Sequence, residues 1–149
     1  MAAHTPTDVA RSAAPTRHVV ETALEHGIDA PWCLSGSGLS LSELNDPATS
    51  VRPDQELTVI RNVIGRLGDR RGLGAEAGAR YSLADTGVLG YALMASPSFG
   101  EAVDVVCRYF SLTSTYFTLT EPITTATGAS ISFDHSGVPA DLRNFLFCV

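Results

Sequence analysis

The stretch Thr86–Leu112, TGVLGYALMASPSFGEAVDVVCRYFSL, decides how the rest of the chain is arranged. It predicts a short apolar helix, a Ser-Pro turn and a long amphipathic helix. Ser98 is the expected N-cap of the second helix, and Glu101 follows at the spacing of a capping box. We expect the apolar stripe of this helix to lie in the core, because amphipathic helices bury their apolar face. The stripe comprises Phe99, Ala102, Val103, Val106, Cys107 and Phe110.

The pattern changes after Leu112. Thr113–Glu121 is rich in β-branched and aromatic residues and stops at Pro122, and Thr127–Phe133 alternates between its two faces. Both patterns are typical of strands, so we expect an antiparallel pair that packs on the helix beginning at Phe99. The predicted fold class is therefore α+β, with N-terminal helices and a small antiparallel sheet.

The N-terminal part predicts a tail followed by a helix. Residues 1–15 show no periodicity and are expected to form a flexible tail, which leaves residues 16–149 as the domain. Thr16 suits an N-cap and Gly27 a helix stop, so a helix is predicted between them. In this helix we expect Val20, Ala23 and Leu24 to face inward and His18 and His26 to lie on or near the outer side.

Three further helices are predicted from local signals. Pro53 suits the first turn of a helix that Gly68 ends. Gly72–Gly78, made of small residues, predicts a helix that packs closely on a neighbour. Pro139–Val149 begins a helix whose inward positions are Leu142, Phe145, Leu146 and Val149.

Composition excludes several classes of protein. The net charge of −6 and the pI of about 5.0 argue against a nucleic-acid surface, which needs a basic patch. No apolar run approaches the roughly 18 residues of a membrane span, and no leader is present, so a cytoplasmic protein without membrane contact is expected. Cys33, Cys107 and Cys148 are widely spaced and fit buried free thiols better than a disulfide or a metal site.

The short motifs do not support catalysis. Ser35–Gly38 lacks the lysine of a phosphate loop, and Gly72–Gly78 follows a helix, whereas a dinucleotide turn must follow a strand. Asp134, His135 and Ser136 are adjacent in an expected turn, where their side chains point apart, and a catalytic triad needs them to converge. We therefore predict no enzyme, no metal and no cofactor.

The central stretch also carries a resemblance to a known family. GVLGYAL at 87–93, SPSFGEAV at 96–103 and RYF at 108–110 stand in the order seen in the effector domain of AraC-type transcription regulators. The branch that they resemble is called arabinose-binding-like. Gly72-Leu73 and an upstream pattern add to the likeness, which spans about residues 16–149. The upstream pattern consists of Leu44, Pro47, Arg52, Pro53 and Gln55.

The resemblance implies a regulatory domain that binds a small organic effector and controls DNA binding by a separate C-terminal domain. Relative to the family, the later effector domain and the helix-turn-helix domain are missing, and the apolar end at Phe145–Val149 also suggests a chain cut short. The effector itself is not readable from the sequence. The expected aromatic lining of its site is Trp32, Tyr91, Tyr109 and Tyr116.

Two alternatives stay open beside this reading. The first is a truncated or interaction-only module, such as a dimerisation piece that forms a homodimer and binds no ligand. The second, an enzyme, would need a nucleophile, acid or metal constellation that no motif supplies.

Overall fold

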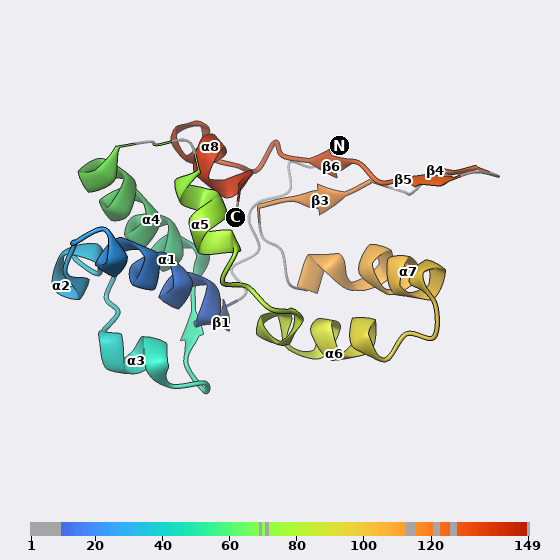
Figure 1. Cartoon of the computed structure of the whole chain (residues 1–149), viewed down its shortest axis with the longest axis horizontal. Helices are drawn as coiled ribbons and strands as arrows, with labels where there is room; N and C mark the ends of the chain where they lie inside the picture. The colour runs from blue at the N-terminus through green and yellow to red at the C-terminus, as the bar shows by residue number, and fades with distance from the viewer. Residues whose placement is uncertain are drawn as a thin grey trace.

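The computed structural model describes residues 10–68, 70, 72–112, 116–120, 123–125 and 128–148. Helices α1–α5 and α8 form one helical body. The α6–α7 pair and a ribbon of short strands, β3–β6, extend from one side of this body, to the right in Figure 1. The helices are α1 (Ala14–Glu25), α2 (Ala30–Cys33), α3 (Leu41–Asn45), α4 (Pro53–Leu67), α5 (Leu73–Gly78), α6 (Val88–Met94), α7 (Phe99–Tyr109) and α8 (Arg143–Leu146). Shorter 3-10 turns are η1 (Leu83–Thr86), η2 (Phe110–Leu112) and η3 (Ala140–Leu142).

The strands are short and antiparallel, which confirms the α+β class. β1 (Arg11–Ser12) pairs with β2 (Ser50–Val51), β3 (Thr118–Leu119) with β6 (Phe133–Asp134), and β4 (Ile123–Thr125) with β5 (Gly128–Ser130). β3, β5 and Phe133 of β6 lie in the two predicted runs, whereas β4 lies between the runs, after Pro122, where no strand was predicted. Thr120 N–H donates to Ser132 O at 2.9 Å and continues the β3–β6 pairing, and the Phe110 and Phe133 rings lie 5.8 Å apart. The ribbon therefore packs on η2, directly after α7, so it meets only the end of the helix on which it was expected to pack. Thr113–Thr115, Glu121 and Thr127 of the predicted strands lie outside the described residues.

The core of the helical body forms where α1 and α4 pack together, with α5 and α8 beside them. Apolar side chains from all four helices and from α3 close this core. Its largest fully buried apolar residues are Leu44, Ile60, Leu142, Val19, Val20, Val59 and Val63. Leu142, Phe145 and Leu146 are buried as predicted, whereas Val149 lies outside the described residues.

The N-terminal prediction was wrong for residues 11–15. Arg11 and Ser12 form β1, and α1 begins at Ala14 with Ala13 as its N-cap, so these residues are structured and the helix starts earlier than Thr16. Ser12 Oγ accepts a hydrogen bond from Ala14 N–H at 3.2 Å, which satisfies one donor of the first turn. Pro15 then suits the first turn because its missing N–H needs no partner there.

The inward face of α1 is also placed differently from the prediction. Val20 and Ala23 are buried, as expected, but Leu24 is exposed and His18 is only 7% exposed. The reason is that α1 packs against α4 on one side and against α5 and the segment that follows it on another. Its buried surface is therefore wider than the apolar residues alone indicate.

Two predicted helix ends and one close contact are confirmed. Gly27 follows α1 and Gly68 follows α4, with φ of 79° and 77°, values that favour glycine. In α5, a Cβ on Gly74 would lie 2.2 Å from the backbone oxygen of Phe145 in α8. Gly72–Gly78 thus packs closely on a neighbouring helix, as the small residues predicted.

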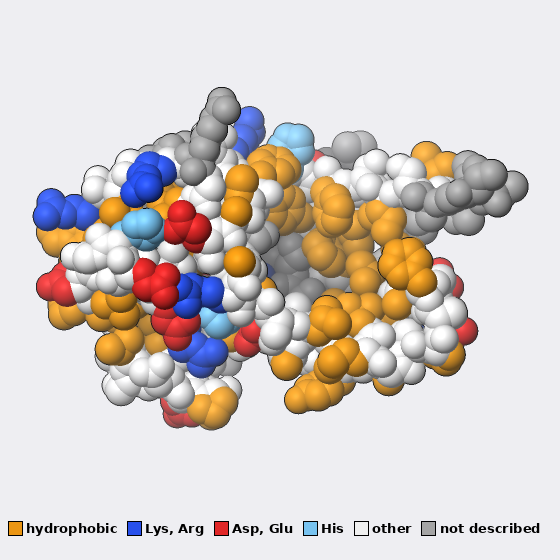
Figure 2. All heavy atoms as spheres, in the orientation of Figure 1, with side chains coloured by type: hydrophobic (Ala, Val, Ile, Leu, Met, Phe, Trp, Pro, Cys, Tyr) orange, Lys and Arg blue, Asp and Glu red, His pale blue; other side chains and the backbone are white. Residues whose placement is uncertain are grey.

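The prediction that the α7 stripe is core was wrong. The helix begins as expected, with Ser98 Oγ accepting from Glu101 N–H at 3.3 Å. Within the described structure, however, none of its residues is buried, and Phe99 is 85% exposed. In Figure 2, hydrophobic side chains gather over α6, α7 and the ribbon. α7 contacts α6, and η2 after it contacts the ribbon, so these neighbours cover only part of the apolar face of α7.

Candidate functional site

A cavity of about 490 Å³ lies between the helical body, η1, the end of α7 and the first residues of the ribbon. Its walls come from α1, α4, α8 and both strands of the β1–β2 pair, so distant parts of the chain meet there. Apolar and aromatic residues make most of the lining, with a few charged and hydroxyl groups among them. The lining residues are Ala10, Arg11, Ser12, Pro15, Thr16, Val19, Val51, Glu56, Ile60, Tyr81, Asp85, Thr86, Gly87, Phe110, Tyr116, Phe117, Phe145 and Leu146.

A buried polar cluster joins β1, α4 and the residue that leads into the ribbon. The Tyr116 hydroxyl donates to Glu56 Oε2 at 2.8 Å and lies 3.4 Å from Pro53 O. Arg11 Nη2 lies 3.9 Å from the same Glu56 oxygen, and the Arg11 guanidinium lies 5.3 Å from the centre of the Tyr116 ring. This cluster ties the start of the ribbon to the helical body.

The protonation of this cluster is shaped by burial. Burial raises the pKa of the Glu56 carboxyl, although the Arg11 charge and the Tyr116 hydroxyl act in the opposite direction. Burial and the neighbouring Glu56 charge also raise the pKa of Tyr116 well above its usual range. Tyr116 therefore stays a neutral hydrogen-bond donor at physiological pH.

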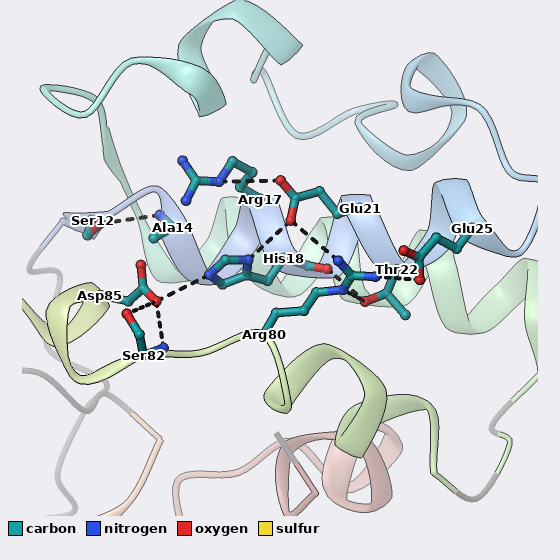
Figure 3. Close-up of polar contacts among 10 residues, drawn as sticks. All are labelled: Ser12, Ala14, Arg17, His18, Glu21, Thr22, Glu25, Arg80, Ser82 and Asp85. Carbon is teal, nitrogen blue, oxygen red and sulfur yellow. Dashed lines mark hydrogen bonds and ion pairs between the residues drawn. The ribbon is translucent and has the colours of Figure 1, made fainter.

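A second polar group lies where η1 approaches α1 (Figure 3). Asp85 Oδ2 accepts hydrogen bonds from Ser82 N–H at 2.7 Å and from Ser82 Oγ at 2.9 Å. The His18 ring lies between two carboxylates, with Nδ1 3.2 Å from Glu21 Oε2 and Nε2 3.4 Å from Asp85 Oδ2. His18 Nε2 is buried and makes no hydrogen bond within the described structure, because its contact with Asp85 lacks hydrogen-bond geometry. The Tyr81 ring packs against this histidine, with ring centres 5.2 Å apart.

The ionisable groups at this end of the cavity differ in their environment. Burial acts to raise the pKa of Asp85, but the hydrogen bonds from Ser82 and the contact with His18 outweigh it and lower the pKa. Asp85 is therefore ionised at physiological pH. Burial, with the negative charges of Glu56 and Asp85 adding to it, raises the pKa of Tyr81 well above its usual range.

Arg80 fixes the chain segment that leads to Asp85. Its Nε donates to Thr22 Oγ1 at 3.1 Å, and its guanidinium forms ion pairs with Glu25 and, at 3.9 Å, with Glu21 (Figure 3). Thr22 Oγ1 in turn donates to His18 O at 2.9 Å. Through these contacts α1 holds the residues between α5 and η1 against its side, which positions Tyr81 and Asp85 in the cavity wall.

Thr16 adds a hydroxyl to the wall of the cavity. The residue is 1% exposed, and its Oγ1 makes no hydrogen bond to any residue that the structure describes. A buried hydroxyl without a partner is costly. A bound molecule or water in the cavity would remove that cost.

The four aromatic residues that the sequence analysis proposed as a lining lie in different places. Tyr116 is in the cavity wall. Trp32 is exposed on α2, where the Arg66 guanidinium lies 5.6 Å from its ring centre. Tyr91 on α6 and Tyr109 on α7 are exposed. The structure does not bring these three residues to the cavity that holds Tyr116.

Several wall residues were not predicted from the sequence. Arg11 fell in the expected tail, and Glu56 fits the acidic first turn of a helix, so neither stood out. Tyr81 and Asp85 fall between the predicted helix Gly72–Gly78 and the stretch that begins at Thr86. A usable signal for Asp85 was its position three residues after Ser82, the spacing of a capping box, which fixes its carboxylate near the η1 backbone.

Other classes of site are not found in the described residues. Among them, no group of three or more His, Cys, Asp or Glu residues could hold a metal ion. In the same part of the chain, no helix is long and apolar enough to span a membrane. The three cysteines are free thiols, as predicted, but only Cys33 is buried, while Cys148 is exposed.

Comparison with known proteins places the chain in a family. The profile of the arabinose-binding domain of AraC transcription regulators, an N-terminal domain, matches residues 27–149. Uncharacterized HTH-type transcriptional regulators of Mycobacterium bovis and Mycobacterium tuberculosis are each 32% identical over 140 residues, which is 94% of this chain and 40% of theirs. The chain thus spans about two fifths of these relatives. No solved structure matches it significantly. The family is one of transcription regulators rather than of enzymes. This chain therefore belongs to the family of N-terminal arabinose-binding domains of AraC transcription regulators.

Proposed function

We propose that this chain is a ligand-sensing regulatory domain that binds a small organic effector in the cavity described above. The observation that carries the proposal is the composition of the cavity wall. Mostly apolar and aromatic walls with a few buried polar groups are typical of small-molecule sites, and about 490 Å³ suits a small metabolite. Membership of a family of effector domains supports the same assignment.

The position of the cavity gives binding a route to regulation. Its wall includes α1 and α4 of the helical body, and also Gly87 before α6 and Phe110 after α7. A ligand that contacts both sides would favour one arrangement of the α6–α7 pair relative to the body, by its difference in affinity for the two arrangements. In a longer regulator this change would act on a separate DNA-binding domain in the cytoplasm, as the relatives' HTH-type naming suggests.

A thermal-shift screen of metabolites tests the proposal. A ligand of the folded state at a hundredfold excess over its Kd stabilises that state by about 2.7 kcal/mol. Thr86→Phe places a ring at the cavity wall and should abolish the shift. Thr58→Phe is the matched control, because Thr58 Oγ1 also donates to a helix carbonyl, Asp54 O, but lies outside the cavity. Equal ligand shifts in both variants, or no hit in a broad screen, would contradict the proposed site.

A second candidate function, an interaction module that joins copies of the regulator, is favoured by the exposed apolar surface of the α6–α7 pair. Val88, Tyr91, Met94 and Phe99 are all exposed there, and Ile123 and Phe133 of the ribbon are exposed too. Contiguous apolar patches of this kind mark interaction sites. Sedimentation analysis over a concentration series, with Phe99→Glu beside the unchanged chain, tests it. A chain that is monomeric at every concentration would count against this function.

A further inference from the structure

Resting on the proposed effector function, we propose that the effector is an organic cation, a small amine with an apolar body, whose ammonium group is held on the acidic side of the cavity by Asp85 and Glu56. The inference names the chemical class of the ligand. It follows from the oxygen atoms that the protein leaves unused, from the sum of the charges in the wall, and from the aromatic rings around them.

The first step concerns Asp85. Its contacts with the described residues use one oxygen: Oδ2 accepts from Ser82 N–H and Ser82 Oγ and lies 3.4 Å from His18 Nε2. Oδ1 contacts no polar group of the described residues, although the side chain is only 17% exposed. An ionised carboxylate oxygen can only accept hydrogen bonds, so a ligand group that binds Oδ1 must be a donor.

Glu56, a second residue of the cavity wall, repeats this arrangement. Its Oε2 accepts from the Tyr116 hydroxyl and faces Arg11 Nη2, while Oε1 has no partner in the part of the chain that the structure describes. The Glu56 side chain is buried to a similar degree. Two carboxylates in one wall therefore each present one unused acceptor oxygen to a ligand.

Buried polar atoms nearby indicate that this end of the cavity is built for a ligand rather than for packing. His18 Nε2 points at the Asp85 carboxylate but forms no hydrogen bond within the described structure, and the residue is only 7% exposed (Figure 3). Thr16 Oγ1, in the same wall, likewise has no partner among the described residues. His18 itself lies behind Asp85 and is not part of the cavity lining, but the buried Thr16 hydroxyl carries a desolvation cost that a well-packed core would avoid.

The charges in the wall decide between ligand classes. Among the described wall residues, two carboxylates, those of Asp85 and Glu56, stand against the guanidinium of Arg11, which contacts Glu56. The lowered pKa of Asp85 keeps its charge in place, whereas the raised pKa of Glu56 makes its charge depend on a neighbouring cation. A carboxylate or phosphate ligand would be repelled by this wall, and an ammonium group would be attracted to it.

The rest of the lining fits the remainder of such a molecule. The rings of Tyr81, Tyr116, Phe110 and Phe117 offer an apolar surface and faces on which a cation can lie. The amine head would therefore bind at the carboxylates and its apolar body against the rings.

Three probes that share a 2-phenylethyl body test the class of ligand: 2-phenylethylamine, 2-phenylethanol and 3-phenylpropanoate, titrated into the 149-residue chain and followed by NMR. We expect the amine to bind about tenfold more tightly than the alcohol, because a charge-assisted hydrogen bond is roughly twice as strong as a neutral one. The carboxylate should bind most weakly. This comparison uses the unchanged protein and does not depend on any variant folding.

Two variants with the same chemical change place the binding. Asp85→Asn keeps an oxygen for Ser82 but removes the charge, and it should bring the amine to about the affinity of the alcohol. Asp141→Asn is the control, because Asp141 pairs with Arg61 outside the cavity and should leave all three affinities unchanged.

Four outcomes overturn the inference: the carboxylate or the alcohol binds at least as tightly as the amine, Asp85→Asn leaves the amine affinity unchanged, Asp141→Asn weakens it as much as Asp85→Asn does, or none of the three probes binds. The proposed function is decided separately by the metabolite screen. A neutral or anionic hit whose thermal shift Thr86→Phe abolishes would keep the effector site and reject the amine.

Discussion

Replacing Gly74 by alanine tests the contact between α5 and α8 directly. A Cβ at this position would lie 2.2 Å from Phe145 O, 3.0 Å from Cys148 Cβ and 3.1 Å from Phe145 C. Real Cβ atoms do not approach a backbone oxygen so closely, and the oxygen cannot rotate away as the end of a side chain could. α5 and α8 must therefore move apart by about 1 Å, which opens the packing around Leu73, Ala77 and Phe145.

The cost of this change can be set against the gain that alanine usually brings. Alanine in a helix is favoured over glycine by about 0.5–1 kcal/mol. Overpacking a close contact costs about 1–3 kcal/mol, and we expect the upper end here because backbone meets Cβ. Gly74→Ala should thus lower the free energy of unfolding by about 2 kcal/mol, since part of the cost is offset by the helix preference.

Gly65→Ala is the matched control and should have the opposite sign. Gly65 lies in α4, is exposed, and a Cβ there meets no atom within 4 Å. The two variants should differ by about 3 kcal/mol, or about 6–12 °C in melting temperature for a chain of this length. Differential scanning calorimetry or thermal denaturation followed by circular dichroism measures both. If Gly74→Ala melts at or above the unchanged chain, the close packing of α5 on α8 is refuted.

Three further predictions concern the core and the cavity. Val63→Asp should lower the free energy of unfolding by about 3–5 kcal/mol because it buries an unpaired charge. Val106→Asp should lower it by about 1 kcal/mol because α7 is only partly covered. Urea denaturation measures both variants, and equal losses would contradict the exposed face of α7. Tyr116→Phe removes the hydroxyl that donates to Glu56 and should lower the free energy of unfolding by about 1–2 kcal/mol in the same assay. An unchanged urea midpoint would contradict this prediction. Because burial raises the folded-state pKa of Glu56 above the ordinary 4.5, its contribution to stability is full below that value and is lost as the pH rises through the folded pKa. Glu56→Gln cannot ionise, so its melting temperature relative to the unchanged chain should rise between about pH 4 and pH 8, and a relative fall would show that the ion pair with Arg11 dominates.

Local signals predicted the helices well because their physical causes are local. The start of α7 at Ser98 depends on a side chain three residues from its partner, and the end of α4 at Gly68 depends on the backbone freedom of one residue. The change from helical to twofold periodicity after Leu112 likewise predicted the antiparallel ribbon. The tail prediction failed because β1 has only two residues, too few for a periodic pattern, and is held by its pairing with β2.

The cavity could not be predicted in the same way because its groups meet only in the folded chain. Arg11 and Glu56 are 45 positions apart, and Tyr116 is a further 60 along. Each has an ordinary local explanation: tail, acidic first turn, strand aromatic. The resemblance to the AraC family predicted that an effector site exists, and aromatic type pointed to Tyr116, but the carboxylates that we propose as ligand contacts depend on tertiary packing alone.

The outcomes for α1 and α7 show what an apolar stripe does and does not predict. On α1 the buried surface exceeds the stripe, because His18 is covered by Tyr81 and by the segment that Arg80 holds against the helix. On α7 the covered surface is smaller than the stripe, because α6 and the ribbon reach only part of it. A stripe therefore identifies the face of a helix that lowers its free energy by meeting another surface. The elements that pack against the helix decide which surface meets that face and how far the contact extends. On α7 no described element covers Phe99, which stays exposed.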